Sequence, residues 1–337
     1  VEEISEEGEQ EGDSITWTLP ELPGDGTQAT MYYTVSVSDP DLDFILSDGF
    51  SATADQWPET EQSGDLITFV GNTVPIWAIQ GPGASSPYII DWLSTRGVVT
   101  GIFPELDGMF IQELETDADP NTSSGLFINL SQVDSLPEIE PGNQVEITGQ
   151  VRETAQQTQL LVEDASDVVM LEKDAEAPEA VEIDPPASWA IAEPYFESLE
   201  GMLVQITGPA KAVSPTSKYG EYVVVRPEWE VDRLWQGEDN GFAIMVDDSS
   251  SATHTDQSTL PYVVNAGDEV NDLIGPLAFT YDRYKIEPIS EPLITTQFDD
   301  LPSLEPVASD ELSLMSWNVE NLFDAREPNP TDPPMPT

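Results

Sequence analysis

The chain has 337 residues, of which 39% are hydrophobic and 8% aromatic, which is enough to bury several cores and excludes global disorder. It carries 65 acidic residues against 10 basic ones, giving a formal net charge of -55, so its surface repels other polyanions unless salt or divalent cations screen it. Cysteine is absent, which excludes disulfides, a thiolate nucleophile and cysteine-bound zinc. This composition favours an extracellular or cell-surface bacterial protein, and a saline habitat is compatible with it.

The first part of the chain combines an acidic run with a β-pattern. Residues 1–13 are rich in Glu, and we expect a flexible acidic tail. Within residues 14–73, apolar and polar residues alternate at 15–19 and 31–37, which predicts strands. This stretch resembles the closing strands of Ig-like repeats on bacterial surface proteins, and it is too short for a complete sandwich. The uncharged run 66–90 is broken by Gly and Pro, so no membrane span is expected there.

Residues 74–173 and 198–290 resemble two copies of one unit. Each copy has about five short strands, with a Gly-Asx-x-Val turn before the fourth, at Gly142 and at Gly267. The strand count and length fit the OB-fold, a five-stranded Greek-key barrel, and a pair of generic β-sandwiches is the alternative. The Ala-, Glu- and Pro-rich residues 174–197 predict an extended linker between the copies, and residues 291–311 predict a second linker.

The most specific motif is the apolar strand at residues 312–323 (LSLMSWNVENLF). It resembles the opening strand of the endonuclease/exonuclease/phosphatase superfamily, and an ordinary strand followed by a turn is the alternative. The order of modules resembles secreted bacterial nucleases in which OB-like domains precede the catalytic domain. That resemblance covers about residues 76–323 and is more specific in the final motif than in the OB-like region.

The resemblance assigns a role to Asn318, which matches the family's strand-terminal asparagine at the scissile phosphate. A neutral amide donor suits phosphodiester hydrolysis, because it adds no negative charge beside the phosphate. The resemblance also implies a divalent metal, Mg²⁺ or Mn²⁺ with Ca²⁺ as a further candidate, held by Asn318 with support from Glu320. The family's later metal-binding glutamate, Asp-x-Asn and histidine are not found in residues 312–337. We therefore expect this chain alone to be catalytically inactive and to be a piece of a longer protein.

The scarce cations gather in the second unit, where six of the ten basic residues lie among aromatic residues. Strand alternation would place Tyr281, Arg283 and Lys285 on one face. Aromatic residues and cations on a barrel face are typical of single-strand binding. The alternative is core aromatics with surface ion pairs, which the net charge favours. The candidate nucleic-acid residues are Tyr222, Arg226, Trp229, Tyr281, Arg283 and Lys285.

Two smaller features complete the candidates. Asp117, Asp119 and Asn121 have the alternate spacing of a calcium loop, although Ile128 stands where an EF-hand would place its glutamate. The family resemblance suggests an acidic hairpin loop there instead. The single histidine, His254, lies in a polar run, and we expect a solvated loop residue.

The sequence therefore predicts an all-β chain with a partial Ig-like sandwich and two OB-like five-stranded barrels, followed at 312–337 by the first strand of an α/β phosphodiesterase domain. The leading functional hypothesis is the front part of an extracellular metal-dependent nuclease acting on DNA in preference to RNA. One alternative is a non-catalytic surface or adhesion protein built of β-modules. The other is a phosphatase or lipid phosphodiesterase of the same superfamily. No sequence feature indicates a protein partner.

Overall fold

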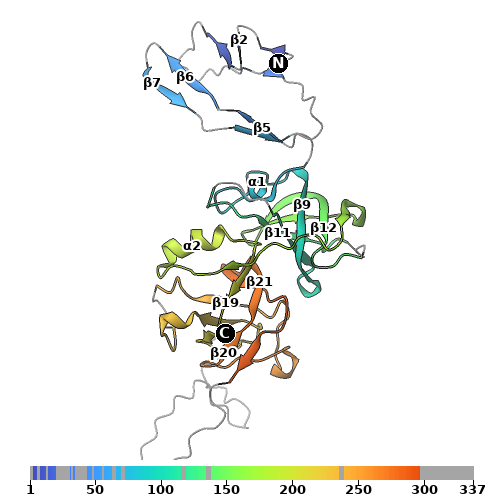
Figure 1. Cartoon of the computed structure of the whole chain (residues 1–337), viewed down its shortest axis with the longest axis vertical. Coiled ribbons are helices and arrows are strands. Elements are labelled where there is room, and N and C mark those ends of the chain that lie inside the picture. Colours follow the sequence, from blue (N-terminus) through green and yellow to red (C-terminus); the bar gives the residue numbers. More distant parts are fainter. Residues whose placement is uncertain are drawn as a thin grey trace, which may run out of the picture. The chain divides into compact units, whose positions relative to one another are not determined.

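The structure is a computed structural model that describes residues 3–5, 8–12, 14–19, 31, 33–34, 44–47, 49–54, 57–62, 66–69, 73–114, 119–133, 138–234 and 239–296. These residues form mostly β-structure with few helices, which confirms the predicted β character of this part of the chain. The first of the two predicted units is cyan to green in Figure 1, and the second is yellow to orange. The motif at 312–323 lies outside the described residues.

Antiparallel pairs make up the described part of the chain before Thr73. β1 (Glu3–Ile4) pairs with β4 (Tyr33–Thr34), β2 (Gly8–Glu11) with β3 (Ser14–Trp17), β5 (Phe44–Ser47) with β8 (Leu66–Phe69), and β6 (Ser51–Ala54) with β7 (Trp57–Gln62). These pairs support the predicted strands, while the Ig-like sandwich itself stays a prediction.

The expectation of a flexible tail over residues 1–13 is wrong for β2. This acidic segment pairs in register with β3, and the indole Nε1 of Trp17 donates a 2.9 Å hydrogen bond to Ser5 Oγ. The turn after β2 begins at Gly12, whose φ of 63° lies in the left-handed region that favours glycine. The pairing with an aromatic strand therefore outweighs the local charge of the run.

The first unit is a closed five-stranded barrel. Its strands are β9 (Trp92–Phe103), β10 (Gly108–Gln112), β11 (Gly125–Asn129), β12 (Gln144–Thr154) and β13 (Gln157–Leu161). The sheet order is β13-β11-β10-β9-β12-β14, with β11 and β13 parallel, and a further β12–β13 pairing closes the ring. Counted from β9, the ring runs 1-2-3-5-4-1, an OB-like order. The short helices η1 (Pro104–Leu106) and η2 (Ala165–Asp167) and the added strand β14 (Val168–Glu172) complete the unit.

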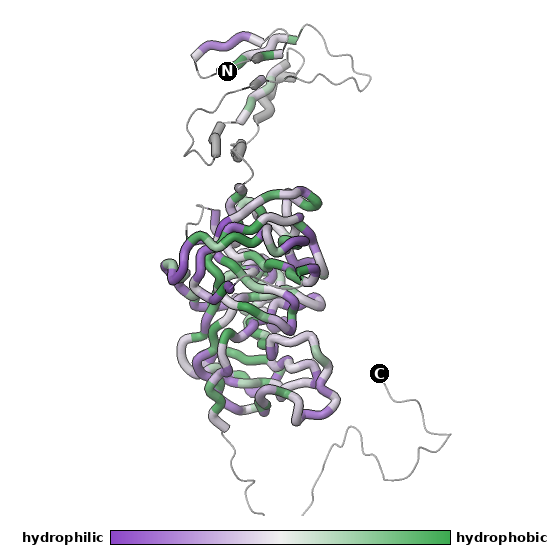
Figure 2. The backbone as a smooth tube through the Cα atoms, turned by 90° about the vertical axis from the view of Figure 1, so that its right-hand side faces the viewer, coloured by the Kyte–Doolittle hydropathy of each residue, from purple (hydrophilic) through white to green (hydrophobic). Residues whose placement is uncertain are grey.

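The core of the first barrel follows from strand alternation. Every second residue of the first eight in β12 is buried, and Val145, Ile147 and Val151 are fully inaccessible. Helix α1 (Ile76–Gln80) adds Ile76 and Ile79, both 0% exposed, to the same core. Figure 2 shows hydrophobic and hydrophilic stretches alternating along the backbone trace.

The second unit is a curved nine-stranded sheet with the order β15-β16-β21-β22-β19-β18-β17-β20-β23. Gly208, with φ 91°, separates β16 from β17, and Asp272, with φ 55°, separates β20 from β21. Because β16 pairs with β21 and β17 with β20, the two breaks interrupt neighbouring strands together. If β16 and β17 are counted as one strand, and β20 and β21 as another, the strand order of this sheet repeats that of the first barrel. The strands are β15 (Val181–Glu182), β16 (Leu203–Ile206), β17 (Ala210–Ala212), β18 (Tyr222–Val225), β19 (Ile244–Val246), β20 (Glu269–Asn271), β21 (Leu273–Thr280), β22 (Arg283–Ile286) and β23 (Leu293–Thr295), with short helices η3 (Pro227–Trp229) and η4 (Gln257–Thr259).

Each unit has the same kind of turn before its fourth strand, with the same side-chain hydrogen bond. Asn143 Oδ1 accepts a 3.0 Å hydrogen bond from the amide of Glu140, and Asp268 Oδ2 accepts a 2.8 Å bond from the amide of Asn265. Gly142 and Gly267 precede these side chains with φ of 89° and 97°. The Gly-Asx pattern seen in the sequence therefore marks equivalent positions before the fourth strand of each copy.

The expectation of an extended linker over residues 174–197 is wrong for residues 189–197. Helix α2 (Trp189–Glu197) lies there, and its Ala192 and Phe196 enter the core of the second unit, where the Phe196 ring stacks on Tyr284 with centroids 5.4 Å apart. The Pro- and Ala-rich composition suggested a linker, but burial of these side chains fixes the segment against the sheet. The second predicted linker also overlaps the structure, because β23 pairs with β20.

The first barrel and the second unit, a half-barrel sheet called the second barrel below, meet at a joint where two glycines approach each other. A Cβ added at Gly201 would lie 2.6 Å from the backbone of Gly125, and a Cβ at Gly125 would overlap the backbone of Gly201 and Met202. Gly201 also has a φ of 74°, which favours glycine. Either side chain would force the backbones of the two barrels apart.

Polar and apolar contacts surround the glycine pair. The amide of Leu203 donates a 2.8 Å hydrogen bond to Gln112 Oε1, and the hydroxyl of Ser123 donates to the carbonyl oxygen of Glu200. Beside them, Ala278 of β21 packs against three phenylalanine side chains of the first barrel. These are Phe103, Phe110 and Phe127.

The second barrel therefore covers the β10–β11 side of the first. The loops beside this side are also engaged, because Ser251 donates to the carbonyl oxygen of Glu105 at 3.1 Å and Gln156 donates to Asp282 at 2.7 Å. In OB-folds the second and third strands and these two loops commonly form the ligand surface. In this protein that surface is an internal contact.

Substitution of Gly125 tests the joint. We expect Gly125→Ala to lower the free energy of unfolding by about 1–3 kcal/mol, because the new methyl group meets backbone rather than a movable side chain. Urea denaturation measures the loss. Gly83→Ala is the matched control, because nothing lies within 4 Å of its added Cβ. Equal stability of the two variants would contradict the close approach.

Candidate functional site

The predicted catalytic and metal residues are only partly within the described residues. Asn318, Glu320 and Asp117 lie outside them. Asp119 and Asn121 are exposed, and Asp119 Oδ1 accepts hydrogen bonds from the amide and the side chain of Asn121 at 2.9 and 2.7 Å. Across the described ranges, no group of three or more His, Cys, Asp or Glu residues is placed to hold a metal ion.

The predicted nucleic-acid face is not assembled as one exposed surface. Tyr222 is 1% exposed and belongs to the core of the second unit, and Lys285 is 2% exposed. Tyr281 is not a strand residue, because it and Asp282 form the turn between β21 and β22 with φ of 52° and 59°. Tyr281 is 85% exposed, and Arg283 beside it is also exposed. Of the six candidates, these two offer the most exposed pair.

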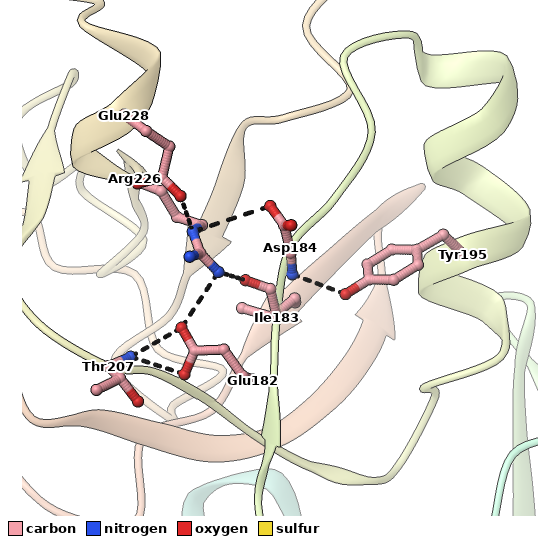
Figure 3. Close-up of polar contacts among 7 residues, drawn as sticks. All are labelled: Glu182, Ile183, Asp184, Tyr195, Thr207, Arg226 and Glu228. Atoms are coloured by element: carbon pink, nitrogen blue, oxygen red, sulfur yellow. Dashed lines mark hydrogen bonds and ion pairs between the residues drawn. The ribbon is translucent and has the colours of Figure 1, made fainter.

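Arg226 is surrounded by acidic partners, as Figure 3 shows. Its guanidinium lies 2.6 Å from Glu228, 3.2 Å from Glu182 and 3.9 Å from Asp184, and it donates to the carbonyl oxygen of Ile183. Burial opposes its charge, but hydrogen bonding and these carboxylates outweigh burial and raise the pKa of Arg226. Arg226 therefore fastens the segment before α2 to the sheet.

Two further contacts complete this fastening. The carboxylate of Glu182 accepts from the amide of Thr207 with both oxygens, and Tyr195 Oη accepts from the amide of Asp184 at 2.7 Å (Figure 3). Trp229, the remaining candidate, stacks on Phe242 with ring centroids 4.5 Å apart. Arg226 is therefore engaged by carboxylates, and one face of the Trp229 ring is covered by Phe242.

Lys285 of β22 belongs to a buried charge cluster with Glu221, Asp247 and Glu287. Its ammonium group contacts Glu221 and lies 3.1 Å from Asp247 Oδ2. Burial opposes the charge of Lys285, but the contacts with Glu221 and Asp247 outweigh burial and raise its pKa. Asp247 is 5% exposed, and burial raises its pKa to about 6 although Lys285 acts against the shift.

Glu287 is the least compensated member of this cluster. It is 1% exposed, and its Oε2 has no hydrogen-bond partner. Burial and the nearby charge of Asp247 raise the pKa of Glu287 well above its usual range, with Lys285 opposing the shift. Burial and Asp247 therefore favour the protonated form of Glu287, and the cluster places one cation, Lys285, among three carboxyl groups.

The expectation that His254 is solvated is wrong. Its side chain is 9% exposed, with Nε2 at 3.0 Å from Asp248 Oδ2 and Nδ1 at 2.8 Å from Thr259 Oγ1. The Asp248 side chain is 2% exposed, and Gly220 leaves the space that its carboxyl group fills. Both partners lie within six residues of His254, in the same loop between β19 and β20, and the polar composition of this loop did not indicate that it folds back to bury the ring.

The comparisons with known proteins bear on the second unit. Residues 170–298 match the model of a Domain of unknown function (DUF8508), which covers less than half of the chain. The matched range includes α2 and β23, in agreement with their packing and pairing in the second unit. A search of curated proteins gave no match. Among the described residues, no helix has the length and apolar character needed to span a membrane.

Titration of Glu287 gives a stability prediction. Because its pKa is raised in the fold, the folded state holds more protons than the unfolded state above the usual carboxyl pKa, and stability falls as pH rises through that window. Glu287→Gln cannot ionise, so we expect it to be more stable than the parent by about 1 kcal/mol or more at neutral pH and similar in stability at acidic pH.

Thermal unfolding across a pH series measures this difference. Glu291→Gln is the control, because it removes the same charge from an exposed position nearby. The assignment of Glu287 as a buried neutral acid would be wrong if both variants changed the pH profile equally.

Proposed function

We propose that residues 73–296 are a non-catalytic accessory module of an extracellular, metal-dependent bacterial nuclease. The barrels would hold and position a phosphodiesterase domain that opens with the strand at 312–323. The observation that carries the accessory role is the burial of the β10–β11 side of the first barrel by the second. Support for the nuclease comes from the motif around Asn318. This motif follows the two OB-like units, an order of modules that resembles secreted bacterial nucleases.

Within this proposal Asn318 positions the scissile phosphate through its amide, and Glu320 supports a bound divalent metal. Mg²⁺ or Mn²⁺, with Ca²⁺ as a further candidate, would supply charge neutralisation for the reacting phosphate. The net charge of -55 makes screening by salt or divalent ions important for approach of DNA, the favoured substrate.

Two alternatives keep the same barrels and differ in chemistry. A non-catalytic surface or adhesion protein is supported by the acidic, β-rich N-terminal part and its resemblance to partial Ig-like repeats. A phosphatase or lipid phosphodiesterase would share the opening strand of the superfamily. The gene that encodes this chain distinguishes them: a glutamate-bearing strand, an Asp-x-Asn and a Ser-Asp-His beside the opening strand would support the phosphodiesterase, and further Ig-like repeats in their place would contradict it.

Binding of a fluorescent single-stranded DNA tests the accessory role. We expect the 337-residue chain to show no saturable change in anisotropy at physiological salt, with or without Mg²⁺, because Lys285 and Arg226 are paired and the net charge is strongly negative. Tyr281→Ala and Arg283→Ala are therefore expected to change nothing.

Salt-sensitive binding that weakens in Tyr281→Ala and Arg283→Ala would contradict the scaffold role and assign binding to the β21–β22 turn. Lys173→Ala is the control, because it removes an exposed cation from the end of the first unit. Loss of binding in all three variants alike would indicate a general charge effect rather than a site.

A further inference from the structure

We propose that the joint between the two barrels is a pH-sensitive latch, in which Glu200 is held as the neutral acid and its ionisation loosens the contact. This inference does not rest on the proposed nuclease function. It concerns a buried carboxyl group that neither the barrel cores nor the predicted catalytic motif employs.

Glu200 lies at the centre of the joint. It is 1% exposed and immediately precedes Gly201, the glycine that meets Gly125. Its Oε1 accepts a 3.0 Å hydrogen bond from the amide of Thr158 on β13, so the side chain of one barrel reaches the backbone of the other. Its carbonyl oxygen accepts from Ser123.

The remaining carboxyl oxygen is not stabilised as an anion. Glu200 Oε2 has no hydrogen-bond partner. The side-chain amide of Gln80 hydrogen-bonds the carboxyl group and acts to lower its pKa, but the same amide donates a 2.6 Å hydrogen bond to the carbonyl oxygen of Gly125. A buried carboxylate with one backbone donor, one shared amide donor and no cation is costly, whereas the protonated acid is tolerated.

The titratable groups facing Glu200 are themselves acidic. Glu197 approaches from α2 and Glu153 from β12, and both carboxylates oppose ionisation of Glu200. Tyr284 of β22 donates its hydroxyl to Glu197, and Glu193 adds a further acidic charge beside Glu197. Burial first, and then Glu197, raise the pKa of Glu200 well above its usual range. No cation is among the groups that act on it in the described structure.

The direction of the effect follows from linkage. In an open joint Glu200 would be hydrated and would titrate near the usual carboxyl pKa, whereas the closed joint retains the proton to higher pH. Between these two values each pH unit shifts the ratio of open to closed joint toward open by up to roughly tenfold. The latch is therefore firmest at mildly acidic pH and loosens as pH rises.

Opening would uncover the β10–β11 side of the first barrel. The three phenylalanines that pack on Ala278 would become accessible together with the two loops held by Ser251 and Asp282. The latch thus controls access to the surface that OB-like barrels commonly use for ligands.

The absence of cysteine allows a direct test on the whole chain. Glu163→Cys in the first barrel and Thr295→Cys in the second place donor and acceptor dyes at exposed positions. We expect the transfer-efficiency distribution to be narrow at mildly acidic pH and to broaden as pH rises. In the Glu200→Gln background it should stay narrow over the same range, because the amide keeps the size of the neutral acid and cannot ionise.

Two further variants separate the latch from general alkaline unfolding. Glu197→Gln removes a neighbouring charge and should reduce the broadening, whereas Glu230→Gln changes an exposed carboxylate of the second unit and should not. Circular dichroism checks that each variant stays folded. The proposal is overturned if Glu200→Gln and the parent broaden alike, or if the parent distribution stays unchanged throughout the pH range.

Hydrogen exchange gives a second readout at the joint itself. After correction for the intrinsic pH dependence of exchange, the amides of Thr158 and Leu203 should lose protection with rising pH in the parent and keep it in Glu200→Gln. Equal protection loss in both proteins would also overturn the latch.

Discussion

The close approach of Gly125 and Gly201 is the constraint on which the arrangement of the two barrels depends. Only a residue without a side chain fits at either position, and the space between the backbones is too small for a methyl group. The contact brings Glu200 to β13 and Ala278 to the three phenylalanines of the first barrel. Because the β10–β11 side is then covered, the first barrel does not expose the surface on which OB-folds commonly bind ligands.

A second constraint on the structure is the small number of basic residues available to pair with acidic ones. Against 65 acidic residues the chain has 10 basic ones, and Arg96, Lys211, Arg226 and Lys285 are each paired with carboxylates. Arg226 and Lys285 form ion pairs between separate segments of the second unit, so their charges stabilise its fold. Burial and neighbouring acidic groups raise the pKa of Glu200 and Glu287, and Lys285 opposes this shift only at Glu287. The stability of the protein and its joint are therefore expected to depend on pH in the same direction.

Local patterns in the sequence predicted the repeat well, because the Gly-Asx turns require left-handed glycines and a short polar side chain. The linker over 174–197 was predicted wrongly, since composition cannot show that Phe196 stacks on Tyr284. Alternation placed Lys285 beside Arg283, but burial of Lys285 depends on Asp247 from another strand end. Neither the joint nor Glu200 has a sequence signature, because both arise from contact between distant segments. The residues around Asn318 lie outside the described structure, so the nuclease remains a proposal.

The central claim is that the two barrels behave as one rigid unit, and native-state hydrogen exchange in urea tests it most directly. The measurement follows core amides of β12 and β18 at mildly acidic pH, where the joint is expected to be closed. The account predicts that both sets exchange through one global unfolding, with the same free energy and the same dependence on urea. Two separate transitions, with the second barrel opening at a lower free energy while the first stays protected, would contradict it.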